Sequence, residues 1–237
     1  MIVIGHRGFP ASYPENTIPS FQAAVKAGAD GVELDVHMSK DGELIVMHDY
    51  TVDRTTDGHG RISSMTLEEI RRLDAGVKRG VKGIGVPTLE EVFEAVGDVL
   101  YVVEIKRGSY LYPGIEEKVI SRIRAHRVRA QVVSFDYDAL NVVRSLDPSL
   151  ETGVIFVGRA PYMITVGKEV RATWLRGASD LLQEGDGDAV HAQGFKLDAW
   201  APSTPEELAS AMRTGADSLT TNSPELALRV LRELKGK

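Results

Sequence analysis

The sequence predicts an α/β protein, a (β/α)8 barrel of the TIM type, and three observations lead to this fold class. Short apolar runs rich in β-branched residues alternate with helical segments along nearly the whole chain. Eight such runs are present, and strands that alternate with helices pair in parallel. The length of 237 residues suits one barrel. We therefore expect a single domain over residues 1–237.

The predicted strands are short and apolar enough to be buried. In chain order they are Ile2–Ile4, Gly31–Val36, Leu100–Ile105, Gln131–Phe135, Thr152–Phe156, Thr173–Leu175, Phe195–Trp200 and Ser218–Thr221. The helical segments have apolar residues three and four positions apart. They are Ile18–Ala27, Leu89–Val96, Ile115–Ala125, Tyr137–Ser145, Pro205–Thr214 and Pro224–Leu234. Five of them follow a residue that can cap a helix: Thr17, Thr88, Asp136, Thr204 and Ser223. The alternation is least regular over residues 156–194.

The segment after the second predicted strand departs from this alternation. Asp41-Gly42 separates that strand from a second β-like run, Leu44–His48, and is typical of a hairpin turn. Too few residues separate the two runs for a parallel crossover, so the strands are expected to be antiparallel.

The rest of this segment, Asp53–Val86, is rich in glycine and threonine. It contains one predicted helix, Leu67–Leu73, with a capping box formed by Thr66 and Glu69. It has too few large apolar residues to bury a core alone. We expect residues 37–87 to form a small cap beside the barrel mouth, the face where barrel enzymes carry their active sites.

Composition and charge exclude several classes of protein. The formal net charge is −6, which argues against a nucleic-acid or anionic-membrane binder. Cysteine is absent, so disulfides and thiolate sites are excluded. No apolar run approaches the roughly 20 residues that span a bilayer, so no stable membrane insertion is expected. The N-terminus becomes charged too early for a signal peptide, and a cytoplasmic location is expected.

Carboxylates recur on one face of the predicted strands. Glu33 and Asp35 are two residues apart, so their side chains share a face of Gly31–Val36. Buried together they repel, and a divalent cation would relieve that repulsion. Glu104 and Lys106 share a face of the next barrel strand, where they would supply a third carboxylate and a phosphate contact. The alternatives are a solvated strand end and a structural ion pair.

His6 and Arg7 end the first predicted strand, directly before Gly8. Catalytic groups of barrel enzymes sit at this position. Arg7 offers a planar guanidinium suited to phosphate. Taken alone, the pair is equally compatible with a surface location.

The hairpin predicts a second imidazole near the carboxylates. If Asp41-Gly42 is a two-residue type I′ loop, both residues have positive φ. Counting along the ladder then places Asp35 opposite His48, and opposed residues point to the same face. In this register His37 pairs with Val46, and we assign it no catalytic role.

These residues resemble the glycerophosphodiester phosphodiesterase family over almost the whole chain. The motifs that carry the resemblance are His6-Arg7-Gly8, Pro14-Glu15-Asn16-Thr17, Glu33-Leu34-Asp35-Val36, Lys40-Asp41-Gly42, His48-Asp49, Pro87-Thr88-Leu89, Glu104-Ile105-Lys106, Ser134-Phe135 and Gly215-Ala216-Asp217.

The resemblance implies metal-dependent hydrolysis of a glycerophosphodiester to glycerol 3-phosphate and an alcohol. It implies that one divalent ion, Mg²⁺ or Ca²⁺, is held by the carboxylates of Glu33, Asp35 and Glu104. It implies that His6 and His48 are the acid–base pair. It also implies that Arg7, Lys106 and Trp200 contact the substrate. The residues do not decide which histidine is the acid, whether water or a neighbouring hydroxyl attacks, or the oligomeric state.

The C-terminal part departs from the family pattern. Trp200 is followed by Ala201 where the family has threonine, and Asn222 stands where the family has aspartate. We expect these differences at the rim that holds the substrate alcohol.

Two other functions are compatible with the fold. A lysophospholipase of D or C type would need an apolar patch around the barrel mouth, and the polar segment Tyr50–Val86 argues instead for a soluble headgroup. A non-catalytic phosphate-binding barrel would be expected to lack a histidine or a carboxylate of the set, and none is missing.

Overall fold

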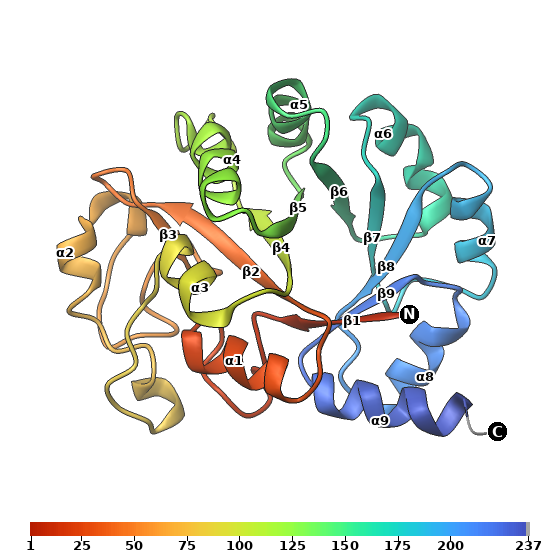
Figure 1. Ribbon diagram of the computed structural model, residues 1–237, viewed down its shortest axis with the longest axis horizontal. Helices are drawn as coiled ribbons and strands as arrows, with labels where there is room; N and C mark the ends of the chain where they lie inside the picture. Colours follow the sequence, from red (N-terminus) through yellow and green to blue (C-terminus); the bar gives the residue numbers. More distant parts are fainter. Residues whose placement is uncertain (236–237) are drawn as a thin grey trace.

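The computed structural model describes residues 1–235 and confirms the predicted fold class: eight parallel strands form a closed barrel with helices around its outside (Figure 1). The barrel strands are β1 (Ile2–His6), β2 (Gly31–Met38), β4 (Leu100–Ile105), β5 (Arg129–Ser134), β6 (Glu151–Phe156), β7 (Trp174–Ala178), β8 (Lys196–Trp200) and β9 (Ser218–Thr221). Neighbours in the chain pair in order, and β1 pairs with both β9 and β2 to close the barrel. A short strand, β3 (Leu44–Val46), pairs antiparallel with the end of β2.

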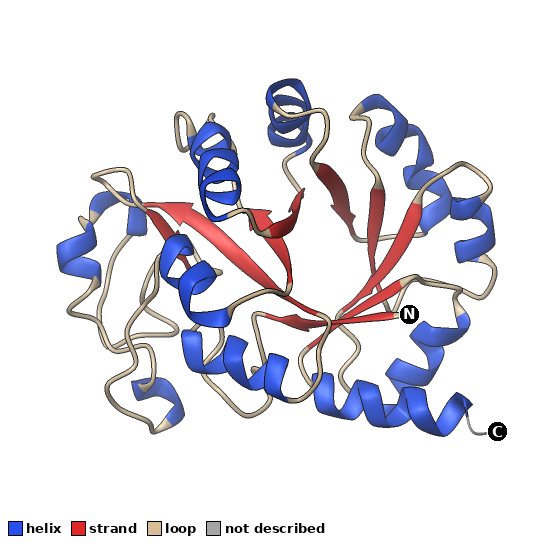
Figure 2. Ribbon diagram, viewed as in Figure 1, coloured by secondary structure: helices blue, strands red, loops and turns tan. Residues whose placement is uncertain are grey.

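The helices lie between the strands, outside the barrel (Figure 2). They are α1 (Ile18–Lys26), α3 (Leu89–Val96), α4 (Ile115–His126), α5 (Tyr137–Leu146), α6 (Ile164–Glu169), α7 (Asp186–His191), α8 (Pro205–Arg213) and α9 (Pro224–Lys235). The six predicted helices are confirmed to within one residue at each end. Two short helices, α6 and α7, follow the 3-10 turn η3 (Ala160–Met163) in the segment where the sequence pattern was irregular.

The predicted caps are confirmed at three helices and wrong at one. Thr88 and Thr204 form capping boxes, and Asp136 accepts the N–H of Ala139. The Thr17 hydroxyl instead donates to the carbonyl of Pro14 (2.7 Å), so α1 begins without a side-chain cap. Pro19 in the first turn of α1 removes one of the N–H groups that a cap would satisfy.

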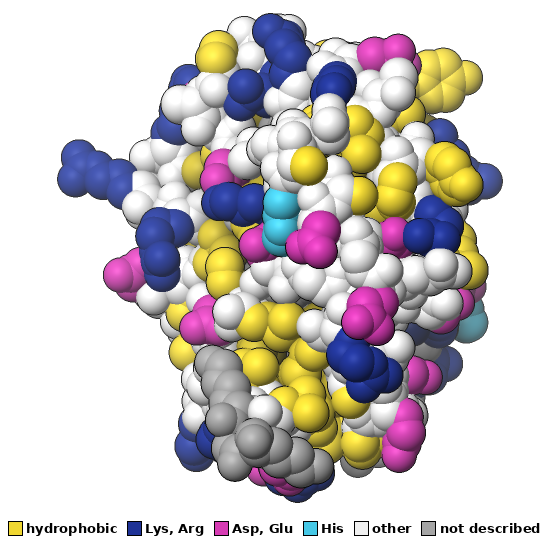
Figure 3. Space-filling view, turned by 90° about the vertical axis from the view of Figure 1, so that its right-hand side faces the viewer, with side chains coloured by type: hydrophobic (Ala, Val, Ile, Leu, Met, Phe, Trp, Pro, Cys, Tyr) yellow, Lys and Arg dark blue, Asp and Glu magenta, His cyan; other side chains and the backbone are white. Residues whose placement is uncertain are grey.

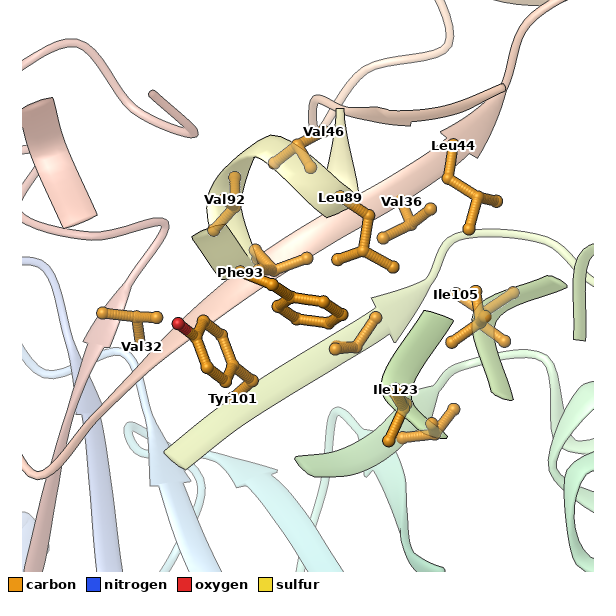
Figure 4. Close-up of a cluster of buried hydrophobic side chains, with 14 of the residues drawn as sticks. Val32, Val36, Leu44, Val46, Leu89, Val92, Phe93, Tyr101, Ile105 and Ile123 are labelled. Carbon is orange, nitrogen blue, oxygen red and sulfur yellow. The ribbon is translucent and has the colours of Figure 1, made fainter. Parts of the chain in front are cut away.

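The outer face of the sheet packs on the helices through apolar side chains, as Figure 4 shows for β2, β4 and α3. Val32 and Val36 of β2 are fully buried against Leu89 and Phe93 of α3. The Phe93 ring meets the ring of Tyr101 edge-on at 4.8 Å between centroids. Because side chains alternate along a strand, this packing turns the other parity of β2 and β4 into the barrel.

The hairpin that follows β2 has a different loop from the predicted one. Val36 pairs with Val46, and the N–H of Ser39 donates to the carbonyl of Glu43 (2.9 Å). The loop therefore has three residues, and its positive φ lies at the last of them, Gly42 (87°). This is a type I turn followed by a bulge, so the predicted two-residue type I′ loop is wrong.

The longer loop shifts the predicted register by one residue. Met47, not His48, lies beside Asp35, and its N–H donates to the Asp35 carbonyl (3.0 Å). His37 pairs with Ile45 instead of Val46. His48 comes two residues after the end of β3, so it is not placed by the ladder. Its carbonyl is instead bonded to Nε2 of His37 (3.0 Å).

The insertion between β3 and α3 contains η1 (Ile62–Ser64), α2 (Leu67–Ile70) and η2 (Val77–Arg79). The capping box of Thr66 and Glu69 is confirmed, although the helix ends earlier than predicted. The buried side chains of the insertion pack together with those of β3 and the residues after it, so the prediction that Asp53–Val86 does not bury a core alone is not contradicted. A small separate cluster of buried side chains lies there: Ile45, Met47, Val52, Ile62, Ile70, Ala75 and Val86. Two of these residues come from β3 and the residue after it, which joins the cluster to the barrel.

The surface is mixed in character. On the face shown in Figure 3, basic and acidic side chains lie interspersed, and apolar side chains gather near the grey residues. Among residues 1–235, no helix is both long and apolar enough to cross a membrane.

Candidate active site

The first turn of the site follows β1. Arg7 and Gly8 both have positive φ (53° and 89°), so the chain turns sharply directly after His6. A Cβ on Gly8 would lie 2.5 Å from the Ser20 hydroxyl, which only glycine avoids. The turn lets the N–H of Arg7 donate to Oε2 of Glu33 (2.9 Å).

Three carboxylates meet inside the barrel mouth. Glu33 and Asp35 come from β2 and Glu104 from β4, and one oxygen of each lies within 4.8 Å of the others. Their exposed fractions are 5%, 1% and 7%. Asp35 and Glu104 are direct neighbours in the β2–β4 register. The two strands therefore bring the predicted carboxylates together.

Two cations lie against this cluster. Lys106 Nζ contacts Glu104 Oε1 (2.8 Å) and Asp35 Oδ1 (3.3 Å). Arg7 Nε lies 3.4 Å from Asp35 Oδ2. If all three carboxylates were ionised, their three negative charges would exceed the two positive ones.

Burial and mutual repulsion raise the pKa of two of the three carboxylates. Burial and the neighbouring Asp35 raise the pKa of Glu104 to about 7. Burial, Asp35 and Glu104 raise the pKa of Glu33 well above its ordinary value. Burial opposes ionisation of Asp35 as well, but Lys106 and Arg7 outweigh it and hold the pKa of Asp35 below its usual range. Ionisation of all three carboxylates at once is therefore unfavourable, and additional positive charge in the site would favour it.

His6 is oriented by Asn222, which directly follows β9. Nδ1 of His6 lies 2.7 Å from Oδ1 of Asn222. The Asn222 amide nitrogen donates to the hydroxyl of Ser203 (3.0 Å), and that hydroxyl donates to the carbonyl of Ala201. This chain of bonds fixes the amide so that its oxygen faces His6, from which we infer that Nδ1 carries the proton and Nε2 is free. Nε2 lies 4.0 Å from Glu33.

Asn222, which was predicted at the rim, contacts His6 as well. The residue touches a predicted catalytic imidazole because it stands at the carboxyl end of a barrel strand. That position is itself a sequence signal for the active face, and it could have identified Asn222.

His48 has a carboxylate partner instead of an amide. Its Nδ1 lies 2.7 Å from Oδ1 of Asp49, and Asp49 is in turn held by Arg54 (2.7 Å). The bonds from Arg54, together with His48, lower the pKa of Asp49 to about 2. Burial lowers the pKa of His48 against the pull of Asp35.

The Pro14-Glu15-Asn16-Thr17 motif connects the two histidine segments. Glu15 accepts from Arg7 (2.9 Å) and from two nitrogens of Arg54 (2.7 and 2.8 Å). Asn16 donates to Oδ2 of Asp35 (2.7 Å) from a backbone with positive φ (55°). Left-handed asparagine costs free energy and persists where its surroundings hold it.

The site opens into a cavity of about 270 Å³ inside the barrel mouth. Seven of the eight predicted site residues line it: His6, Arg7, Glu33, His48, Glu104, Lys106 and Trp200. The eighth, Asp35, is buried behind them at 1% exposure. Trp200 packs edge-on against Phe135, with 5.9 Å between the ring centroids. An open groove of about 530 Å³ shares His48 and Lys106 with the cavity and continues outward past Tyr50 and Arg107.

Comparison with known proteins places these features in a family. Residues 6–226 match the model of the glycerophosphoryl diester phosphodiesterase family. A glycerophosphodiester phosphodiesterase of Caldanaerobacter subterraneus subsp. tengcongensis is 40% identical over 98% of both chains. One of Bacillus subtilis is 32% identical over 97% of this chain and 86% of its own.

Solved structures agree in fold. A phosphodiesterase of Oleispira antarctica, in complex with the product sn-glycerol-3-phosphate, superposes with a TM-score of 0.90 at 24% identity, covering 98% of this chain and 97% of its own. A glycerophosphodiester phosphodiesterase of Thermotoga maritima gives 0.79 at 27% identity, with 97% and 98% covered.

Proposed function

The chain belongs to the glycerophosphoryl diester phosphodiesterase family and is a phosphodiesterase, and from this premise we propose that it cleaves glycerophosphodiesters to glycerol 3-phosphate and an alcohol. In this proposal one divalent cation and the imidazoles of His6 and His48 carry the reaction. The observation that supports it most is the arrangement at one cavity: two carboxylates, two cations and two imidazoles line it, the third carboxylate, Asp35, lies directly behind them, and each imidazole is held through Nδ1.

The carboxylates fit a hard divalent cation. Glu33, Asp35 and Glu104 offer oxygens only, which Mg²⁺ and Ca²⁺ prefer. Oδ1 of Asp35 makes no hydrogen bond to any described residue. A cation held by these three side chains would supply positive charge to the phosphate oxygens. Either Mg²⁺ or Ca²⁺ satisfies this donor set.

Arg7 and Lys106 would hold the phosphate. Both line the cavity, and both are already fixed by contacts with Asp35. Fixed donors stabilise the charge that develops on the phosphate oxygens without reorganising during the reaction.

The Nδ1 partners of the two imidazoles suggest which one acts as the base and which as the acid. The amide oxygen of Asn222 accepts from Nδ1 of His6 and leaves the Nε2 lone pair free, which suits a general base. Asp49 places a negative charge at Nδ1 of His48, which stabilises the imidazolium form and suits a general acid. His6 would therefore take the proton of the attacking hydroxyl, and His48 would protonate the leaving alkoxide.

The outer groove favours one second candidate. Phe135 and Tyr50 line it and are 45% and 38% exposed. Exposed aromatic rings beside the site suit an apolar chain as well as a small headgroup. A lysophospholipase activity on the same site is therefore the alternative substrate assignment.

A metal-controlled assay tests the proposal. The protein, stripped with a chelator, is given glycerophosphocholine, glycerophosphoethanolamine or lysophosphatidylcholine, with Mg²⁺, with Ca²⁺ or with neither. We expect glycerol 3-phosphate from the first two substrates, and only when a cation is present. Turnover of lysophosphatidylcholine alone would favour the alternative. Full activity after chelation would contradict the metal assignment.

A further inference from the structure

We infer that the bottom of the catalytic cavity is a hydroxyl-binding subsite, in which Arg176, Asp198 and Thr220 hold the terminal hydroxyl of the glycerol moiety. This inference rests on the proposed function, because it names the part of a glycerophosphodiester that enters the barrel.

The three residues come from consecutive strands on the inner face of the barrel. Arg176 of β7 pairs with Asp198 of β8 in the register, and Thr220 of β9 lies next to them. All three line the same cavity as His6 and Glu33. A substrate whose phosphate lies between the histidines would therefore extend its buried end toward this group.

Their hydrogen-bonding capacity is only partly used. Oδ1 of Asp198 accepts from the hydroxyls of Thr220 (3.0 Å) and Ser218. Nη2 of Arg176 donates to Gln131. The ion pair itself is long, with 3.3 Å between Nη1 of Arg176 and Oδ2 of Asp198. Nε of Arg176 and Oδ2 of Asp198 make no hydrogen bond to any described residue, although the two side chains are only 3% and 1% exposed. Buried polar atoms without partners are costly, and a bound hydroxyl would satisfy them.

The local sequence makes room for this pair. Gly153 on β6 faces Arg176, and a Cβ there would lie 3.0 Å from its Nε. Across the barrel, Val102 of β4 and Val133 of β5 line the cavity with apolar side chains, and Ile155 of β6 adjoins them. The cavity therefore has one polar and one apolar side, which matches a short polyol with C–H groups on one side and hydroxyls on the other.

Charge balance selects a hydroxyl over an ion. Arg176 and Asp198 neutralise each other, so the subsite offers neither sign in excess. A second phosphate or a carboxylate would have no unpaired cation there, and an ammonium group would have no unpaired anion. An uncharged hydroxyl accepts from the guanidinium and donates to the carboxylate at the same time.

Two substrates that differ by one hydroxyl test the subsite. Glycerophosphocholine and 2-hydroxypropyl phosphocholine share the leaving group and the hydroxyl nearest the phosphate, and only the terminal hydroxyl differs. We expect wild-type kcat/KM to favour glycerophosphocholine by about 100-fold or more, because a site built to bind a hydroxyl strongly rejects the analogue that lacks it. A ratio near one would overturn the inference.

Variants separate recognition from folding. Arg176→Met with Asp198→Leu removes both charges together, so neither is left unpaired. We expect its ratio to fall below about five, mainly through loss on glycerophosphocholine. Thr220→Val gives a smaller fall and decides the matter if the double variant does not fold. Ser218→Ala is the matched control, because Ser218 bonds the same carboxylate but does not line the cavity. It should keep the wild-type ratio.

The outcomes distinguish this inference from the proposed function. Variants that slow both substrates equally, or that keep the wild-type ratio, would overturn the subsite while the activity stands. If wild type hydrolyses neither substrate, the proposed function fails. Calorimetry then decides the subsite: tighter binding of glycerol 3-phosphate than of 1,2-propanediol 1-phosphate supports it, and equal binding overturns it.

Discussion

Replacing Asn222 by alanine should impair proton transfer at His6 while substrate binding stays nearly unchanged. The bond between His6 Nδ1 and the Asn222 oxygen is 2.7 Å long and lies where the His6 side chain is 17% exposed. Its removal leaves a largely buried N–H without an acceptor, which costs about 1–3 kcal/mol. Because 1.4 kcal/mol is tenfold in rate, we expect kcat to fall by about 10- to 100-fold. KM should change by about twofold or less, because Asn222 does not line the cavity.

Steady-state kinetics with glycerophosphocholine at saturating metal measures this effect. Asn222→Asp retains an acceptor oxygen and should recover most of the lost kcat. Ser203→Ala removes the bond that orients the amide and should cause a smaller loss than Asn222→Ala. If Asn222→Ala kept kcat within twofold of wild type, or lost activity only through KM, the inferred tautomer and orientation of His6 would be wrong.

Further substitutions test other parts of the site. Glu33→Gln should weaken binding of Mg²⁺ or Ca²⁺ by at least about tenfold in calorimetry, with activity returning at high metal; unchanged affinity would refute the ligand assignment. His48→Ala should lower kcat by about 10²–10⁴ while metal affinity stays near wild type, and a near-normal kcat would rule out its role as acid. Gly8→Ala should cost about 2–5 kcal/mol in urea unfolding, from positive φ and from a Cβ 2.5 Å from Ser20, and a loss below 1 kcal/mol would contradict the geometry. The pKa of Asp49 is about 2 in the folded protein against an ordinary 3.8, so its contribution to stability is present above pH 4 and is lost as the pH falls toward 2. Asp49→Asn should therefore show a shallower loss of stability over that range in acid titrations followed by circular dichroism, and an unchanged slope would contradict the shift.

The barrel could be predicted because each of its elements has a local signal. The two carboxylates two residues apart on β2, the single carboxylate on β4, and the capping residues before the helices can each be recognised in the local sequence alone. Parallel strands then bring their carboxyl ends to one face, so Glu33, Asp35 and Glu104 converge.

The hairpin register could not be predicted in the same way. Asp-Gly is compatible with a two-residue loop and with a three-residue one. The longer loop makes a tertiary contact: the carboxylate of Asp41 accepts from the N–H of Leu67 (3.0 Å) at the start of α2. A pattern confined to the hairpin does not contain this contact. His48 nevertheless lines the cavity, and the bond between its carbonyl and His37 Nε2, not the β2–β3 pairing, helps to place it there.

The contact of Asn222 depends on the closed barrel, and the contacts between Arg176 and Asp198 depend on the pairing of two strands. Asn222 meets His6 only because β9 pairs with β1, at a separation of 216 residues in the chain. Arg176 and Asp198 look like isolated charges on apolar strands until β7 and β8 are placed side by side. Both pairs of neighbours arise from strand pairing, which no single segment reports.

The two imidazoles belong to different parts of the fold. His6 ends a strand of the barrel, whereas His48 belongs to the insertion, which packs in a small apolar cluster shared with β3. Parts of a protein open locally with free energies that range from near zero up to that of global unfolding. An excursion that releases the insertion withdraws His48 and Asp49 together, while His6 and the carboxylates stay in place. The opening equilibrium of the insertion, which amide hydrogen exchange measures, then sets the fraction of molecules with a complete site, and turnover declines on warming before the barrel melts.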